Sequence, residues 1–233
     1  MVGTPQTGGI LIIADHASNR VPTGIDLGID PALLDQHIAL DIGVAGVAER
    51  MVAADRRFAA LLGNVSRLVC DFNREEDAPG IVPSESDGQA IPGNRLDPAG
   101  LAERIARFHR PYHATIEAHL AATPPALILS LHSFTPALCS GDEARPWHVG
   151  VLYNHDDRGA RRAIPLLETE GLCVGDQLPY SGTLLNATMN RHAEAHGRLY
   201  VGVEVRQDQI GNAAGQALWA ERLLRVCRKI VAN

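Results

Sequence analysis

Short apolar runs that stop at polar clusters alternate along the chain with longer stretches of helical spacing. Residues 9–15 (GILIIAD) lead into the polar HASNRVP, as a buried strand leads into a loop. By the same pattern we predict strands at residues 59–62, 65–70, 127–131, 147–153, 172–174 and 199–205. We predict helices at residues 31–57, 98–122, 158–170 and 213–230.

This alternation predicts an α/β fold with a mainly parallel sheet between helix layers. Residues 77–98 hold four prolines and three glycines without periodicity, which predicts a long loop that can cover a site. At 233 residues the chain is long enough for a large core, and we expect a single domain spanning residues 1–233.

Composition narrows the function classes. The chain is 45% hydrophobic and 21% charged, and its apolar runs are far shorter than the ~20 residues that span a bilayer, so we expect no membrane partner. Its net charge of −6 opposes binding to nucleic acid. Four scattered cysteines without CxxC spacing suggest reduced thiols and a cytoplasmic protein. No pattern indicates an oligomeric state.

Two of the ten histidines come directly after predicted strands, His16 after the first and His132 after residues 127–131. Ligands of open α/β sheets bind beyond the carboxyl ends of the strands, so we expect the two imidazoles to meet there. Imidazoles and a carboxylate suit Zn²⁺ or another divalent transition metal. Asp41 follows His37 by four residues, on the same face of the predicted helix, and is the preferred third ligand. Asn19, a poor zinc ligand, and a water molecule are the alternatives.

One carboxylate lies inside the last predicted strand. Glu204 lies within Val-Gly-Val-Glu-Val, where an ionisable group is costly unless it is paired, bound to metal or transferring protons. It is the candidate general base, and an ion pair with Arg206 is the structural alternative. Arg67, Arg74 and Arg206 flank predicted strand ends, and their guanidinium groups suit substrate carboxylates.

Other motifs are incomplete. The pairs His109/His113 and His192/His196 have HxxxH spacing but not the HExxH order of zinc proteases, so we do not take them as primary sites. No serine lies in a GxSxG elbow, and no glycines form GxGxxG or GxxxxGK. Serine hydrolases and nucleotide-dependent enzymes therefore have little support.

Six motifs in order span the chain: DHASNRVP at residues 15–22, HIALDIG at 37–43, SRLVCDFNR at 66–74, LHS at 131–133, PYSG at 179–182 and VEVRQD at 203–208. In this order they resemble the N-formylglutamate amidohydrolase family, which is similar to zinc carboxypeptidases and aspartoacylase. The resemblance implies a three-layer α/β/α sandwich with a central mixed, mainly parallel sheet of the phosphorylase/hydrolase-like kind.

The resemblance also implies roles for individual residues. Arg74 is implied as the clamp for the substrate α-carboxylate, with Asn73 as its orienting neighbour and Glu204 as the base. Carboxypeptidases take two metal ligands from an HxxE motif, whereas this chain has Asn19 at the Glu position. Asp41 is therefore expected to substitute for that ligand.

We therefore expect metal-dependent hydrolysis of a small N-acyl amino acid, with N-formyl-L-glutamate as the first candidate. Glu204 takes the proton of the attacking water, and Arg67 or Arg206 holds the second carboxylate or the tetrahedral oxyanion. One alternative is a zinc peptidase or cell-wall amidase with a larger substrate. Another is a non-catalytic carboxylate-binding relative that has lost its metal. An open groove beside residues 77–98 would favour the first alternative, and lack of metal would favour the second.

Overall fold

The computed structural model describes residues 1–139, 141 and 144–232. Its strands are β1 (Ile10–Ala14), β2 (Phe58–Leu62), β3 (Glu85–Ser86), β4 (Gln89–Ala90), β5 (Leu127–Phe134), β6 (Val149–Leu152), β7 (Val174–Asp176) and β8 (Tyr200–Arg206). Its α-helices are α1 (Val44–Ala54), α2 (Pro98–Arg104), α3 (Arg110–Ala122), α4 (Arg158–Glu168), α5 (Ala187–His192) and α6 (Ala213–Ala232). Short 3-10 helices are Pro31–Asp35, Pro92–Asn94, Glu194–His196 and Gln207–Gln209, and a π-helical turn, Ile105–His109, joins α2 to α3.

Six strands form the central sheet in the order β2-β1-β5-β8-β6-β7. β2, β1, β5 and β8 run parallel, whereas β6 runs antiparallel to β8 and parallel to β7. Strands β3 and β4 form a separate small hairpin. The sheet is thus mixed and mainly parallel, as predicted, and the carboxyl ends of β1, β5 and β8 lie at one edge.

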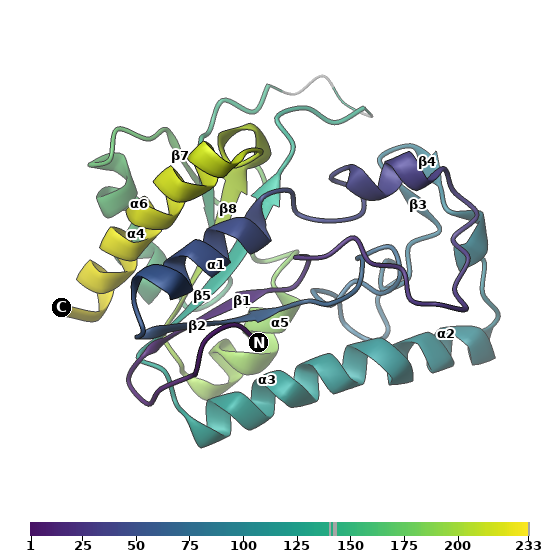
Figure 1. Ribbon diagram of the computed structural model, residues 1–233, viewed down its shortest axis with the longest axis horizontal. Coiled ribbons are helices and arrows are strands. Elements are labelled where there is room, and N and C mark those ends of the chain that lie inside the picture. Colours follow the sequence, from purple (N-terminus) through teal and green to yellow (C-terminus); the bar gives the residue numbers. More distant parts are fainter. Residues whose placement is uncertain (140, 142–143, 233) are drawn as a thin grey trace.

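Alternate residues of the strands pack into two different cores. In β1, Ile10, Ile12 and Ala14 belong to one buried cluster and Leu11 and Ile13 to another. Helices α1, α4 and α6 supply the first cluster, while α3, α5 and the π-helical turn supply the second, so helices cover both faces of the sheet (Figure 1). A strand buried on both faces needs a continuous apolar run, which is the pattern read at residues 9–15. The predicted three-layer sandwich is confirmed.

The predicted helix at residues 31–57 is wrong in its middle. A 3-10 helix ends at Asp35 and α1 begins only at Val44, with turns between them. The intervening backbone is bound to other segments, because the carbonyl of Ala39 accepts hydrogen bonds from Ser66 Oγ at 2.8 Å and from the Arg67 N–H at 3.2 Å. Gly43, with φ of 84°, precedes α1, and a Cβ there would lie 2.1 Å from the carbonyl oxygen of Ile210. These long-range contacts override the apolar spacing.

Smaller differences affect other predicted elements. Residues 65–70 are turns rather than a strand, because Ser66 holds the local backbone through Val69 N–H at 2.8 Å and Leu68 N–H at 3.1 Å. β5 continues three residues beyond its predicted end, β7 lies two residues later than predicted, and the sequence did not indicate α5. Residues 77–98 are mostly irregular, as predicted, and contain the β3–β4 hairpin. Within the described ranges, no helix is both long and apolar enough to cross a membrane.

Candidate metal and substrate site

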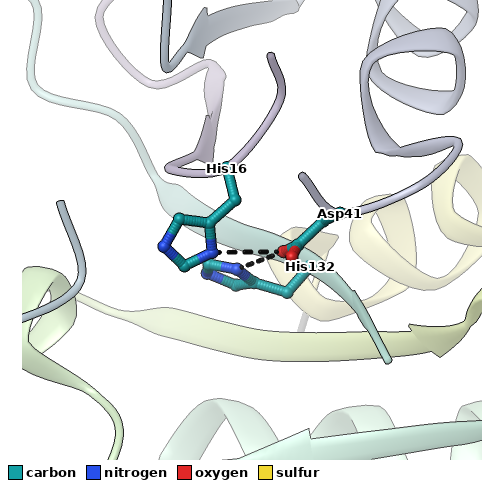
Figure 2. Close-up of side chains that lie close together, drawn as sticks. All are labelled: His16, Asp41 and His132. Atoms are coloured by element: carbon teal, nitrogen blue, oxygen red, sulfur yellow. Dashed lines mark hydrogen bonds and ion pairs between the residues drawn. The ribbon is translucent and has the colours of Figure 1, made fainter. Parts of the chain in front are cut away.

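Two imidazoles and one carboxylate converge at the carboxyl edge of the sheet. His16 lies two residues after the end of β1, His132 lies on β5, and Asp41 lies in the turns before α1. Figure 2 shows both rings turned toward one oxygen of Asp41, with Oδ2 at 2.9 Å from His132 Nδ1 and 3.4 Å from His16 Nδ1. The ring centroids are 5.2 Å apart. Among the described residues this is the one group whose three ligand atoms lie within 4.8 Å of one another.

The opposite nitrogen of each imidazole faces a second carboxylate. His16 Nε2 lies 2.7 Å from Asp71 Oδ1, and His132 Nε2 lies 3.5 Å from Asp15 Oδ2. The other oxygen of Asp15 accepts a hydrogen bond from Tyr112 at 2.7 Å. A carboxylate on the far nitrogen fixes the ring and directs the near lone pair inward, as in metal sites that use histidine. The donor set therefore fits a divalent cation.

The charge balance of the site leads to the same conclusion. Four carboxylates, when ionised, face only two guanidinium groups, so with neutral imidazoles the site has two negative charges in excess. These groups are the carboxylates of Asp15, Asp41, Asp71 and Glu204 and the guanidinium groups of Arg67 and Arg74. A buried excess of this size is costly unless cations balance it. One divalent ion, or two protonated imidazoles, would do so.

The pKa values reflect this crowding of opposite charges. Burial favours the neutral acids, yet the facing imidazoles outweigh it and hold the pKa of Asp41 and Asp71 well below the usual range. Burial likewise disfavours imidazolium, but Asp71 and Asp41 raise the pKa of His16, and Asp15 and Asp41 raise the pKa of His132. The carboxylates therefore remain charged and are available as metal ligands or as hydrogen-bond acceptors.

Arg67 connects two of these carboxylates. Its Nη1 donates to Asp41 Oδ1 at 3.2 Å and its Nη2 to Asp71 Oδ2 at 3.0 Å. Because the guanidinium group is planar, the two contacts fix both acids relative to each other. Arg67 was predicted to bind substrate, and it does line the cavity, but two of its donors are already engaged by the protein.

Glu204 lies beside His132, because the register of β5 and β8 pairs these two residues. Burial raises the pKa of its carboxyl to about 7, although His132 acts in the opposite direction. No hydrogen bond to this carboxylate is found within the described part of the chain. A carboxylate that titrates near neutral pH and lines a cavity can accept and return a proton under working conditions.

A polar cavity of about 170 Å³ opens over these groups. Its wall includes Asn73 and Arg74, the two other predicted substrate-binding residues that reach it. Arg74 Nε lies 3.8 Å from Asp71 Oδ2, which leaves its remaining donors for a ligand. Asn73 Oδ1 accepts the N–H of Thr188 at 3.0 Å, so its amide group is held in one orientation.

The remaining predicted residues lie elsewhere. Arg206 is absent from the cavity wall, because its guanidinium group binds Asp208 at 2.8 Å and the carbonyl of Arg145 at 3.1 Å. Asn19, the alternative ligand, donates instead to Asp35 at 2.9 Å on the surface. The helix face expected to carry His37 and Asp41 does not exist. His37 still lines the cavity, where it bonds to Asp87 at 3.0 Å.

Several residues of the site had no role in the sequence interpretation. Asp15 and Asp71 were visible only as the first acids of polar clusters at strand ends. Asp15 directly precedes His16, and Asp71 lies two residues before Asn73; this proximity was the available signal. Tyr180, which lies in the PYSG motif, lines the cavity and accepts a hydrogen bond from Arg145 at 3.0 Å. No local pattern distinguished it.

Comparison with known proteins gives consistent results. The model of the N-formylglutamate amidohydrolase family matches residues 8–211. A gene product of Agrobacterium tumefaciens of known structure is 29% identical, with 97% of this chain and 92% of that chain covered and a TM-score of 0.90. The N-formylglutamate amidohydrolase of Ralstonia eutropha JMP134 is 17% identical, with 99% and 95% covered and a TM-score of 0.75, and shares the fold. A search of curated proteins finds no match.

The family match covers most of the chain, including every candidate ligand and the general-base candidate. It agrees with the six ordered motifs and with the mixed sheet of the fold. The chain therefore belongs to the N-formylglutamate amidohydrolase family and is an amidohydrolase.

Proposed function

We propose that the protein is a metal-dependent hydrolase of small N-acyl amino acids. The first candidate reaction is N-formyl-L-glutamate plus water giving L-glutamate and formate. The observation that carries the proposal is the convergence of His16, His132 and Asp41 within 4.8 Å in a small polar cavity beside Glu204.

Zn²⁺ or another divalent transition metal is held by His16, His132 and Asp41 in this proposal. Such an ion, when bound, polarises an amide carbonyl and lowers the pKa of a water molecule. Asp71 and Asp15 orient the two imidazoles from behind, at 2.7 and 3.5 Å. Asp41 stays ionised, because the imidazoles keep its pKa low.

Glu204 acts as the proton carrier. It accepts a proton from the water that attacks the acyl carbon and passes it to the amine nitrogen as the C–N bond breaks. Support comes from the raised pKa, about 7, and from the adjacency to His132 across the β5–β8 register. A carboxylate with an ordinary pKa would be a weaker base and would hold the proton less readily for the leaving amine.

Arg74 binds the substrate α-carboxylate, and the fixed amide of Asn73 orients it. Arg74 is the guanidinium group in the cavity wall to which the described residues make no hydrogen bond, whereas Arg67 already bridges Asp41 and Asp71. Arg67 therefore acts by fixing the acids of the metal site. The amino-acid side chain extends into an adjoining outer cavity of about 320 Å³, whose wall also includes Arg74.

The size of the site favours a single amino-acid derivative over a polymer. The inner cavity measures about 170 Å³, and the β3–β4 hairpin contributes Glu85 and Ser86 to the wall of the outer one. Residues 77–98 therefore bound the space available to the distal end of a substrate. A peptidoglycan or peptide chain needs a longer open groove.

The test is an activity screen of N-formyl, N-acetyl and N-succinyl amino acids before and after treatment with a chelator. We expect hydrolysis of N-formyl-L-glutamate that is lost with the chelator and restored by Zn²⁺. The His132→Ala variant should contain no metal and show no activity, while the matched surface variant His155→Ala keeps both. Full activity in the metal-depleted protein would refute the proposal.

A further inference from the structure

Three histidines that do not line the substrate cavity form a second buried cluster. His109 lies on the π-helical turn, His113 on α3 and His192 on α5, and their exposed fractions are 1%, 1% and 2%. Buried imidazoles are costly unless their nitrogens are hydrogen-bonded, and apolar residues could fill this volume at lower cost. We therefore expect the cluster to have a role other than packing.

His109 and His113 both contact the main chain next to Arg74, the proposed clamp for the substrate carboxylate. His113 Nε2 lies 3.0 Å from the carbonyl oxygen of Phe72, and His109 Nε2 lies 2.9 Å from that of Arg74. Thr188 on α5 adds its hydroxyl to the Phe72 carbonyl at 3.2 Å. The Phe72 carbonyl is thus held from two helices, α3 and α5, and the Arg74 carbonyl is contacted from the π-helical turn.

The hydrogen-bond pattern determines which nitrogens carry hydrogens. A carbonyl oxygen only accepts, so His113 Nε2 donates to the Phe72 carbonyl. The Nε2 of His109 lies 3.1 Å from that nitrogen and 2.9 Å from the Arg74 carbonyl, so it either accepts from His113 or donates to Arg74. Burial lowers the pKa of His113 to about 4, so this imidazole is neutral and its Nδ1 holds a lone pair. That lone pair accepts from His192 Nε2 at 2.8 Å. The cluster is therefore a directed chain of donors that ends on the Phe72 carbonyl.

The helix is modified at the position where the cluster forms. The π-helical turn Ile105–His109 interrupts the continuous helix from α2 to α3 and inserts one residue into its periodicity. His109 and His113, four residues apart, then lie on the face that packs against residues 72–74. Such turns are often found at functional sites, although they cost regular hydrogen bonding.

We infer that the histidine cluster positions Asn73 and Arg74 for binding the substrate carboxylate. The inference rests on the proposed function, in which Arg74 is that clamp. His113 is a positioning residue because it acts through the Phe72 carbonyl. Loss of its donor leaves the Phe72 carbonyl with only the longer hydrogen bond from Thr188 among the described residues, at 3.2 Å. The peptide group is then held less firmly, and the guanidinium group of Arg74 shifts relative to the metal-site residues.

The test compares N-formyl-L-glutamate with its α-carboxamide on His113→Leu and His113→Gln. Gln retains a donor at the position of Nε2, whereas Leu removes it. We expect the wild type to prefer the carboxylate in kcat/KM, and His113→Leu to lose about tenfold of that preference through KM while turnover of the carboxamide is unchanged. His113→Gln should restore most of it, and metal content should be equal in all variants.

An undiminished preference in His113→Leu, or an equal loss on both substrates, would overturn the inference. If His113→Leu does not fold, His192→Leu takes its place, because it removes the donor to His113 Nδ1. An unchanged preference for the carboxylate substrate in that variant would also overturn the inference. A wild type without preference for the carboxylate would instead contradict the proposed function. The two failures are therefore distinguishable.

Discussion

Replacing Glu204 with Gln separates catalysis from stability, because we expect the two to move in opposite directions. The carboxyl has a pKa of about 7 instead of the ordinary 4.5, which corresponds to about 3 kcal/mol. Between these pH values the folded protein binds more protons than the unfolded chain, so the free energy of unfolding falls as pH rises. The destabilisation that comes from ionising buried Glu204 is complete above pH 7 and absent below about pH 4.5.

Gln does not titrate, so Glu204→Gln avoids this cost. After removal of metal by a chelator, the variant should be more stable than wild type at pH 8 by about 1–3 kcal/mol, since burial of the amide offsets part of the gain. That gain corresponds to about 3–10 °C in Tm for a chain of this length. At pH 5 the two proteins should unfold at nearly the same temperature.

Turnover should respond in the other direction. Loss of the proton carrier should lower kcat by about 10²–10⁴ on the best substrate, with metal content unchanged. Thermal unfolding, elemental analysis and steady-state kinetics measure the three quantities. Glu117→Gln, on the exposed side of α3, is the matched control and should alter none of them. Turnover within about threefold of wild type refutes the base, and a variant that is less stable at pH 8 refutes the burial argument.

Four further substitutions test the site and the residues around it. Asp71→Asn should weaken metal binding by about 10–100-fold in a chelator competition, because His16 loses its orienting carboxylate, and unchanged affinity would contradict this role. Arg74→Ala should raise KM by about 10–100-fold, whereas Arg206→Ala should change it by less than about threefold, since that guanidinium group lies outside the cavity. Burial lowers the pKa of His192 to about 3, so the unfolded chain binds more protons below pH 6.5 and stability falls on acidification. Between pH 6.5 and 4, His192→Gln should reduce the fall in the free energy of unfolding by about 3 kcal/mol, as measured by denaturant titrations. An unaltered dependence of that free energy on pH would show that this histidine is not responsible.

The strands and the two imidazoles were predictable because their signals are local. An apolar run that ends in a polar cluster identifies a strand and the residues beyond it, and His16 and His132 follow from that rule. The adjacency of Glu204 to His132 follows from the parallel pairing of β5 and β8, once their order is known.

The segment around Asp41 was not predictable in the same way. Its apolar spacing is helical, but its backbone conformation depends on hydrogen bonds from residues 66–67, more than twenty positions away. The position of Arg206 outside the cavity has a similar cause. Its guanidinium group binds Asp208, which follows β8, and the carbonyl of Arg145, which lies in the loop that precedes β6. Asp41 reaches the site by tertiary contacts rather than by helix periodicity.

The reversed direction of β6 has a consequence for how this enzyme can diversify. Because β6 runs opposite to β5, the chain leaves β5 and enters β6 at the same edge of the sheet, the one that carries the metal-site residues. Of the described residues in the connection from β5 to β6, Thr135 lines the inner cavity and Leu138 the outer one. Insertions or deletions there can reshape substrate access during evolution while every strand keeps its register.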